Sequence, residues 1–254
     1  MGLESYVREN LKRKDILLMT HIVLGYPSFD HNFQMIQTMA EAGVDLMELQ
    51  IPFSEPIADG PVIARAGQKA LEAGITTQGC LDFVREAVRT FELPLLIMSY
   101  YNIPFTYGLD RFVALGAKIG LKGMIIPDLP PEEGTDYLKL MQQYNLAPIQ
   151  LYSPTTSFPR MRHLAALARG FVYCVARKGV TGSHTRFTRE MTAYLRRCRE
   201  ATPLPLAVGF GIKEKRDVEF LKGKSDIAVI GTQTLRLMEQ EGVDSVRRFI
   251  ENLV

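Results

Sequence analysis

The chain has few cysteines, and their arrangement does not suggest a crosslinked structure. Its 254 residues include three, Cys80, Cys174 and Cys198, an odd number without a Cys-x-x-Cys pair. Disulfide frameworks need cysteines in pairs, and zinc sites need closely spaced ligands. We therefore expect neither a disulfide nor a zinc site. Because such a composition suits a reducing compartment, it predicts a cytoplasmic protein.

The sequence also lacks an excess of charge of either sign and any long apolar run. Its 30 basic and 28 acidic residues give a formal net charge of +2, which argues against a surface devoted to nucleic acid or to an anionic membrane. No apolar segment is long enough to cross a bilayer. Residues 1–14 mix charged and apolar side chains in the manner of an amphipathic helix, without the apolar centre of a signal peptide.

Two kinds of ligand-binding motif are missing as well. The four histidines, at positions 21, 31, 163 and 184, show no metal-ligand spacing. His21 lies in an apolar run, where we expect a histidine whose polar atoms are satisfied inside the fold, and the other three are expected at the surface. No Gly-x-Gly-x-x-Gly segment opens a helix after the first apolar run, which argues against dinucleotide binding.

Eight short runs rich in Ile, Leu, Val and Met divide the chain. Each is apolar almost throughout, as expected of a parallel strand that is covered on both faces. The runs are 16–24, 45–51, 95–100, 123–126, 148–152, 171–176, 204–208 and 227–230. They predict eight buried strands.

Helical patterns separate these runs. Apolar residues recur three and four positions apart, as at Leu81, Val84 and Val88. Eight strands that alternate with about eight helices, without a low-complexity linker, predict an α/β protein. The predicted architecture is a single (β/α)₈ TIM barrel over residues 1–254, with an extra N-terminal helix. A doubly wound open sheet is the alternative, and the number of strands favours the barrel.

Two acidic residues lie where a barrel builds its active site, at the strand ends and in the loops after them. Glu48 stands near the end of the second apolar run, and Asp59 lies in the Pro-rich loop that follows. A buried carboxylic acid at a strand end can hold and give a proton near neutral pH. Each has a structural alternative, because Glu48 could form an ion pair and Asp59 precedes a glycine, as in an ordinary turn.

Glycines follow the last three apolar runs, in the segments 179–182, 209–212 and 231–232. Barrels commonly bind a phosphate at the loops after their last strands, where backbone N–H groups and a helix N-terminus approach the anion. The three segments predict a phosphate site, with a helix that begins near Thr232. Aromatic residues near strand ends could line the mouth of the barrel against a flat apolar ligand, or they could pack in the core. These aromatic residues are Tyr100, Tyr101, Tyr173 and Phe210.

Several ordered motifs over essentially the whole chain resemble those of the tryptophan synthase alpha subunit family. The matching segments are 24–27, 48–61, 127–133, 153–156, 170–173, 177–182, 209–212 and 231–232. The resemblance implies a carbon–carbon lyase of tryptophan biosynthesis. Such an enzyme cleaves indole-3-glycerol phosphate to indole and D-glyceraldehyde 3-phosphate by a retro-aldol reaction.

The resemblance also assigns roles to residues at matching positions. Glu48 matches the catalytic glutamate, which would give a proton to indole C3, and Asp59 matches the catalytic aspartate, which would stay ionised beside N1. Unequal burial of the two carboxyl groups could supply their different protonation states. The matched substrate-binding residues are Gly182, Gly211, Gly231 and Thr232 around the phosphate, Tyr173 and Phe210 around the indole, and Thr181 in a loop that closes over the site. To these we add Tyr100 from its place near a strand end.

Four positions depart from the family pattern. Gln50 stands where glycine is usual and could crowd the strand exit, His21 replaces an apolar aromatic residue, Ala176 replaces serine, and Gly-Thr-Gln at 231–233 replaces Gly-Ser-Ala. None removes a catalytic group. We expect these differences to affect substrate affinity and rate more than the class of reaction.

The resemblance implies a partner, a pyridoxal phosphate-dependent beta subunit that consumes the indole within an αββα heterotetramer. The cofactor would belong to that partner, and we expect none in this chain. Three alternatives stay open: a free-standing indole-3-glycerol phosphate lyase, another phosphate-handling barrel such as a sugar-phosphate isomerase, and a non-catalytic regulator of a beta subunit.

Overall fold

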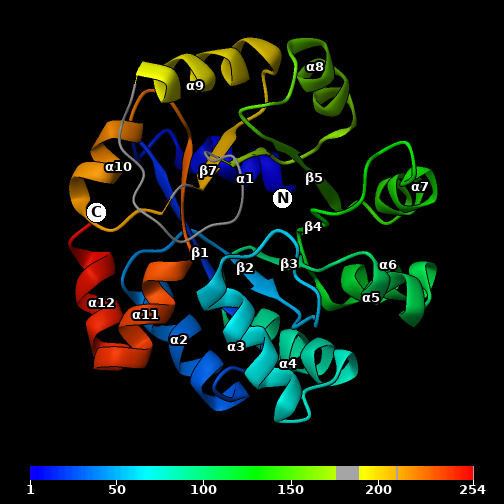
Figure 1. Ribbon diagram of the computed structural model, residues 1–254, viewed down its shortest axis with the longest axis vertical. Coiled ribbons are helices and arrows are strands. Elements are labelled where there is room, and N and C mark those ends of the chain that lie inside the picture. The colour runs from blue at the N-terminus through cyan, green and yellow to red at the C-terminus, as the bar shows by residue number, and fades with distance from the viewer. Residues whose placement is uncertain (176–188, 210, 254) are drawn as a thin grey trace.

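The computed structural model describes residues 1–175, 189–209 and 211–253 (Figure 1). Within these residues, parallel strands pair in chain order, and the last pairs with the first to close a barrel. The strands are β1 (Leu17–Val23), β2 (Leu46–Gln50), β3 (Leu95–Met98), β4 (Gly123–Ile125), β5 (Ala147–Tyr152), β6 (Val172–Val175), β7 (Leu206–Gly209) and β8 (Ile227–Ile230). The predicted (β/α)₈ barrel is confirmed. The open-sheet alternative is wrong, because β8 pairs with β1.

Helices surround the barrel (Figure 1). They are α1 (Leu3–Asn10), α2 (Phe29–Glu41), α3 (Pro61–Glu72), α4 (Thr77–Thr90), α5 (Asn102–Tyr107), α6 (Leu109–Ile119), α7 (Thr135–Gln143), α8 (Phe158–Leu167), α9 (Arg189–Ala201), α10 (Lys215–Leu221), α11 (Thr232–Glu241) and α12 (Val243–Glu251). None of the helices described in these three stretches combines the length and the apolar character that a membrane crossing needs.

Alternation along the strands divides the apolar residues into two layers. Side chains on a strand point to opposite faces in turn. Met19 and Leu46 accordingly belong to a cluster inside the barrel, whereas Leu18 and Met47 belong to a larger cluster between the strands and the helices. The strands are apolar throughout because both of their faces are covered.

The predicted N-terminal helix is confirmed as α1, and its apolar residues join the inner layer. Leu3 and Val7 are buried in the same cluster as Leu17 and Phe171, which lie at the amino ends of their strands. Helix α1 therefore covers the amino end of the barrel. The opposite end is left for a site.

Local interactions set several of the helix ends. The Ser28 hydroxyl accepts a hydrogen bond from the backbone N–H of His31 and caps α2. Gly120 ends α6 in a left-handed conformation, with a φ of +105°, which glycine adopts without a steric penalty.

Candidate functional site

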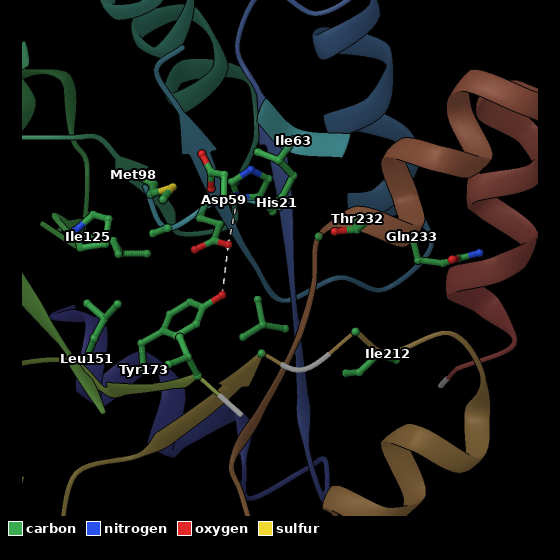
Figure 2. A pocket seen from close by; sticks show the side chains of 18 of the residues that line it. His21, Asp59, Ile63, Met98, Ile125, Leu151, Tyr173, Ile212, Thr232 and Gln233 are labelled. Atoms are coloured by element: carbon green, nitrogen blue, oxygen red, sulfur yellow. Dashed lines mark hydrogen bonds and ion pairs between the residues drawn. The ribbon is translucent and has the colours of Figure 1, made fainter. Parts of the chain in front are cut away.

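A cavity lies at the carboxyl ends of the strands, and it gathers most of the predicted site residues that the structure describes (Figure 2). Those that line it are Glu48, Asp59, Tyr173, Gly211, Gly231 and Thr232. Apolar side chains such as Met98, Ile125 and Leu151 line it as well. Segments far apart in the sequence therefore contribute acids, an aromatic ring and glycines to one cavity.

Glu48 is held from both sides inside this cavity. It sits in β2 opposite His21 of β1, both side chains point into the barrel, and only 4% of Glu48 is exposed. Its Oε1 lies 3.0 Å from Nδ1 of His21 and accepts a hydrogen bond of 3.5 Å from the hydroxyl of Tyr173. Dashed lines in Figure 2 mark these two contacts, and the Tyr173 hydroxyl points toward the carboxyl group.

The charge of Glu48 raises the pKa of both of its partners, His21 and Tyr173. Burial lowers the pKa of His21, but the hydrogen bond and the charge of Glu48 outweigh burial, so the pKa of His21 is raised. The pKa of the Tyr173 hydroxyl is raised as well, mostly by burial and to a smaller extent by the charge of Glu48. The geometry thus favours an imidazolium at His21 and a neutral phenol at Tyr173, both able to donate to Glu48.

Asp59 reaches the same cavity from the loop after β2. It is 8% exposed, and its Oδ2 accepts a hydrogen bond of 2.6 Å from Nε2 of Gln50. Burial raises the pKa of Asp59, while the Gln50 hydrogen bond acts in the opposite direction because it stabilises the carboxylate.

The two acids differ in their partners more than in their burial. Glu48 and Asp59 are 4% and 8% exposed, so unequal burial, as expected from the sequence, does not separate them. Glu48 contacts two ionisable side chains, His21 and Tyr173, which can share a proton with it. The hydrogen bond that Asp59 accepts from the Gln50 amide and its interaction with the Tyr100 hydroxyl both stabilise the carboxylate, and this environment favours an acid that acts through its charge.

Tyr100 packs against the loop that carries Asp59 and hydrogen-bonds to its backbone. Its side chain is fully buried, its ring stacks on Phe53 at 5.2 Å, and its hydroxyl accepts a 3.0 Å hydrogen bond from the backbone N–H of Ala58. It is not among the described residues that line the cavity. The structure therefore places Tyr100 as a support for the loop, whereas the sequence suggested an aromatic residue facing the ligand.

The glycine-rich end of the cavity lies across from the acids. Strand β8 ends at Ile230, and α11 begins at Thr232, as predicted. The N-cap of this helix is Gly231, which has no side chain to cap it, and the first backbone N–H groups of a helix lack intrahelical partners, a setting that suits an anion. Gly211 has a φ of +79°, a conformation that suits glycine. Figure 2 shows Thr232 at the start of the helix, and it is one of the residues that line the cavity.

Two basic residues at this end were missed in the sequence. Lys213 and Arg236 also line the cavity. Arg236 follows Thr232 by four positions, so a helix beginning at Thr232 would bring both to one face. That spacing could have identified Arg236, whereas nothing in the sequence pattern points to Lys213.

Three predicted residues, Thr181, Gly182 and Phe210, lie outside the described residues, as does the departure at Ala176. Their roles stay predictions. The sequence alone assigns no functional role to His21 and predicts only crowding at Gln50. In the structure each contacts one of the two acids.

A closed parallel barrel with paired acids in a cavity at its carboxyl end defines an enzyme of the (β/α)₈ class. The profile of the tryptophan synthase alpha chain family matches residues 7–253. The chain belongs to this family.

Relatives of known name agree over the whole chain. It is 59% identical to the tryptophan synthase alpha chain of Desulforapulum autotrophicum over 251 residues, 99% of each chain. It is 54% identical to that of Syntrophotalea carbinolica over 251 residues, again 99% of each.

Solved structures share the fold. A chain of Mycobacterium tuberculosis tryptophan synthase superposes with a TM-score of 0.92 at 26% identity, covering 99% of this chain and 96% of that one. The tryptophan synthase subunit alpha of Legionella pneumophila gives a TM-score of 0.89 at 31% identity, covering 100% and 97%.

Proposed function

We propose that this protein performs the alpha reaction of tryptophan synthase with Glu48 and Asp59 as its catalytic residues. The reaction is a lyase reaction of tryptophan biosynthesis, in which indole-3-glycerol phosphate is cleaved to indole and D-glyceraldehyde 3-phosphate. The observation that supports the assignment of residues is the convergence of two buried carboxyl groups on one cavity whose far end is lined by glycines and a helix N-terminus.

The bond to be broken joins indole C3 to the glycerol chain, and an aromatic carbanion is a poor leaving group. Protonation of C3 removes this difficulty, because the ring then departs as neutral indole. Glu48 gives this proton, and its contacts with His21 and Tyr173 supply donors that can restore it. The same carboxylate can accept the proton of the glycerol hydroxyl as the carbon–carbon bond breaks.

Protonation at C3 leaves positive charge near N1 of the ring. Asp59 in its ionised form stabilises that charge, and the amide of Gln50 favours the ionised form. The phosphate binds at the opposite end, against Gly211, Gly231 and the first N–H groups of α11. Thr232 contributes its hydroxyl there, and the predicted Gly182 would complete the site.

The family pairs with a beta subunit. We propose an αββα heterotetramer in the cytoplasm, in which the beta subunit holds pyridoxal phosphate and uses the indole, while this chain needs no cofactor of its own. We also propose that residues 1–254 act as one domain, a view supported by the pairing of β1 with β8 from opposite ends of the sequence.

An indole-release assay on the purified chain, with and without a beta subunit, tests the function. Glu48→Gln and Asp59→Asn should each abolish turnover while binding of glyceraldehyde 3-phosphate is retained. Turnover close to that of the unmodified chain in either variant would refute the assignment of that residue. Activity on an aminoaldose phosphate without any on indole-3-glycerol phosphate would favour the isomerase alternative instead.

A further inference from the structure

Two polar residues inside the barrel, His21 and Gln50, are not explained by the fold. Only 5% of His21 and 2% of Gln50 is exposed, in positions where neighbouring strands place apolar side chains. Burying a polar group costs free energy unless it is hydrogen-bonded. Within the described part of the chain, the side-chain hydrogen bond of His21 goes to Glu48 and that of Gln50 goes to Asp59, and both partners are predicted catalytic acids.

Backbone register explains how these contacts arise. His21 of β1 lies directly opposite Glu48 of β2, and Gln50 follows Glu48 by two positions, so all three side chains point into the barrel. Gln50 stands at the last position of β2, next to the loop that returns with Asp59. A strand residue therefore holds the loop acid directly, at 2.6 Å.

Within the described residues, His21 and Gln50 each keep one polar atom without a hydrogen-bond partner. Nε2 of His21 and Oε1 of Gln50 are buried and have no hydrogen-bond partner among the described residues. The Gln50 side chain is near enough to contribute to the raised pKa of His21. A protonated imidazole carries an N–H on both nitrogens, so one could donate to Glu48 and the other to Gln50 after a small shift.

We propose that His21 and Gln50 are positioning residues, a polar bridge that holds the two catalytic carboxyl groups of this chain in their working places. This inference rests on the proposed function. His21 holds Glu48 on the strand and Gln50 holds Asp59 on its loop, so the geometry needed at C3 and at N1 is supplied within the barrel. The titratable groups around the bridge are Glu48, Asp59, His21 itself, Tyr173 beside Glu48, and Tyr100 beside Asp59.

The bridge makes a specific prediction for Gln50. Gln50→Met keeps the length of the side chain but removes the donor to Asp59. A hydrogen bond to a charged group contributes about 1.5–3 kcal/mol, which corresponds to a fall in kcat of about 10-fold to 150-fold if it acts only in the transition state. KM and the Kd of glyceraldehyde 3-phosphate should change less than about threefold, because the phosphate end does not contact Gln50.

A conservative substitution separates positioning from packing. In Gln50→Glu the protonated acid can donate to Asp59, whereas the ionised acid repels it. The kcat of this variant, as a fraction of that of the unmodified chain at the same pH, should therefore rise as the pH is lowered. Likewise His21→Asn, which keeps a donor toward Glu48, should retain more kcat than His21→Phe, which keeps only the bulk.

Gln150 offers a matched control. It is a buried glutamine in β5 whose neighbours Ile149 and Leu151 point inside the barrel, so it faces the helices and not the cavity. Gln150→Met should leave kcat and its pH profile unchanged. Circular dichroism and thermal unfolding of each variant show that it is folded before its kinetics are compared.

The outcomes are distinct. Loss of kcat in Gln50→Met together with recovery of Gln50→Glu at low pH supports the bridge. If the unmodified chain releases indole but Gln50→Met and Gln50→Glu match it at every pH, the bridge is refuted while the proposed function stands. If the unmodified chain releases no indole even with a beta subunit, both fail. Should Gln50→Met not fold, Gln50→Glu decides by the presence or absence of its recovery at low pH.

Discussion

Gly209, at the end of β7, leaves room for the ring of Tyr173. A Cβ atom placed on Gly209 would lie 2.9 Å from the Tyr173 hydroxyl oxygen, 3.1 Å from Cε1 and 3.3 Å from Cζ. These distances are too short for unstrained contacts, so in Gly209→Ala the ring must move. The hydroxyl of Tyr173 would then leave its place beside Glu48, and the wall of the cavity would change shape.

The size of the effect follows from two opposing terms. Overpacking costs about 1–3 kcal/mol, whereas replacing glycine by alanine in an accessible conformation contributes about 0.4–1 kcal/mol of stability. We expect Gly209→Ala to lower the free energy of unfolding by about 1–2 kcal/mol, or the Tm by about 2–8 °C. Because Tyr173 lines the cavity, KM for indole-3-glycerol phosphate should rise.

Urea unfolding and steady-state indole release measure the two effects, and a double-mutant cycle assigns them. Tyr173→Phe removes the hydroxyl that makes the shortest contact, so Gly209→Ala should cost at least about 0.5 kcal/mol less in that background. Gly67→Ala is the control, because its Cβ would meet nothing nearer than a carbonyl oxygen at 3.9 Å. That variant lies within α3 and should gain about 0.5–1 kcal/mol. Equal losses with and without the Tyr173 hydroxyl would refute the argument.

Two further predictions concern stability. Gly25 has a φ of +78°, and a Cβ atom there would lie 2.4 Å from Cγ1 of Ile75. Gly25→Ala should therefore lower the free energy of unfolding, measured by urea titration, by about 2–4 kcal/mol. An unchanged free energy of unfolding would show that the turn is not constrained. The pKa of His21 is raised above 6.5 in the folded chain, so its stabilising contribution is complete below pH 6.5 and is lost as the pH rises through the folded pKa. The stability of the unmodified chain relative to His21→Phe should therefore fall as the pH rises above 6.5, and a difference that is constant or that grows would contradict the ion pair with Glu48.

Most of the barrel could be predicted because its strands and helix ends are determined by residues that are close together in the sequence. Each predicted strand is present, with ends that differ by at most two residues, since a strand covered on both faces is apolar at every position. The start of α11 at Thr232 and the cap at Ser28 follow from short-range chemistry as well. The prediction that the sheet closes into a barrel depended on the number of strands. The pairing of β1 with β8 confirms it.

The site could be predicted only in part, because contacts between strands depend on register. Glu48 and Asp59 were placed at the right end of the barrel by their positions after β2. Nothing local indicates that His21 stands opposite Glu48, since that neighbour is 27 positions away in the chain. Gln50 was expected to crowd the strand exit, but its amide instead reaches Asp59, because the loop turns back over the end of β2. Tyr100 lies near the carboxyl end of its strand, as predicted, but its ring packs against the loop after β2 and does not line the cavity.

We expect one substrate to span the cavity, with its indole ring between the two acids and its phosphate at the glycine-rich end. A crystal structure of the Glu48→Gln variant soaked with indole-3-glycerol phosphate tests it most directly. We expect the phosphate at Gly211, Gly231 and the first turn of α11, with C3 beside residue 48 and N1 beside Asp59. Phosphate bound elsewhere, or a ring that contacts neither position 48 nor Asp59, would contradict the account.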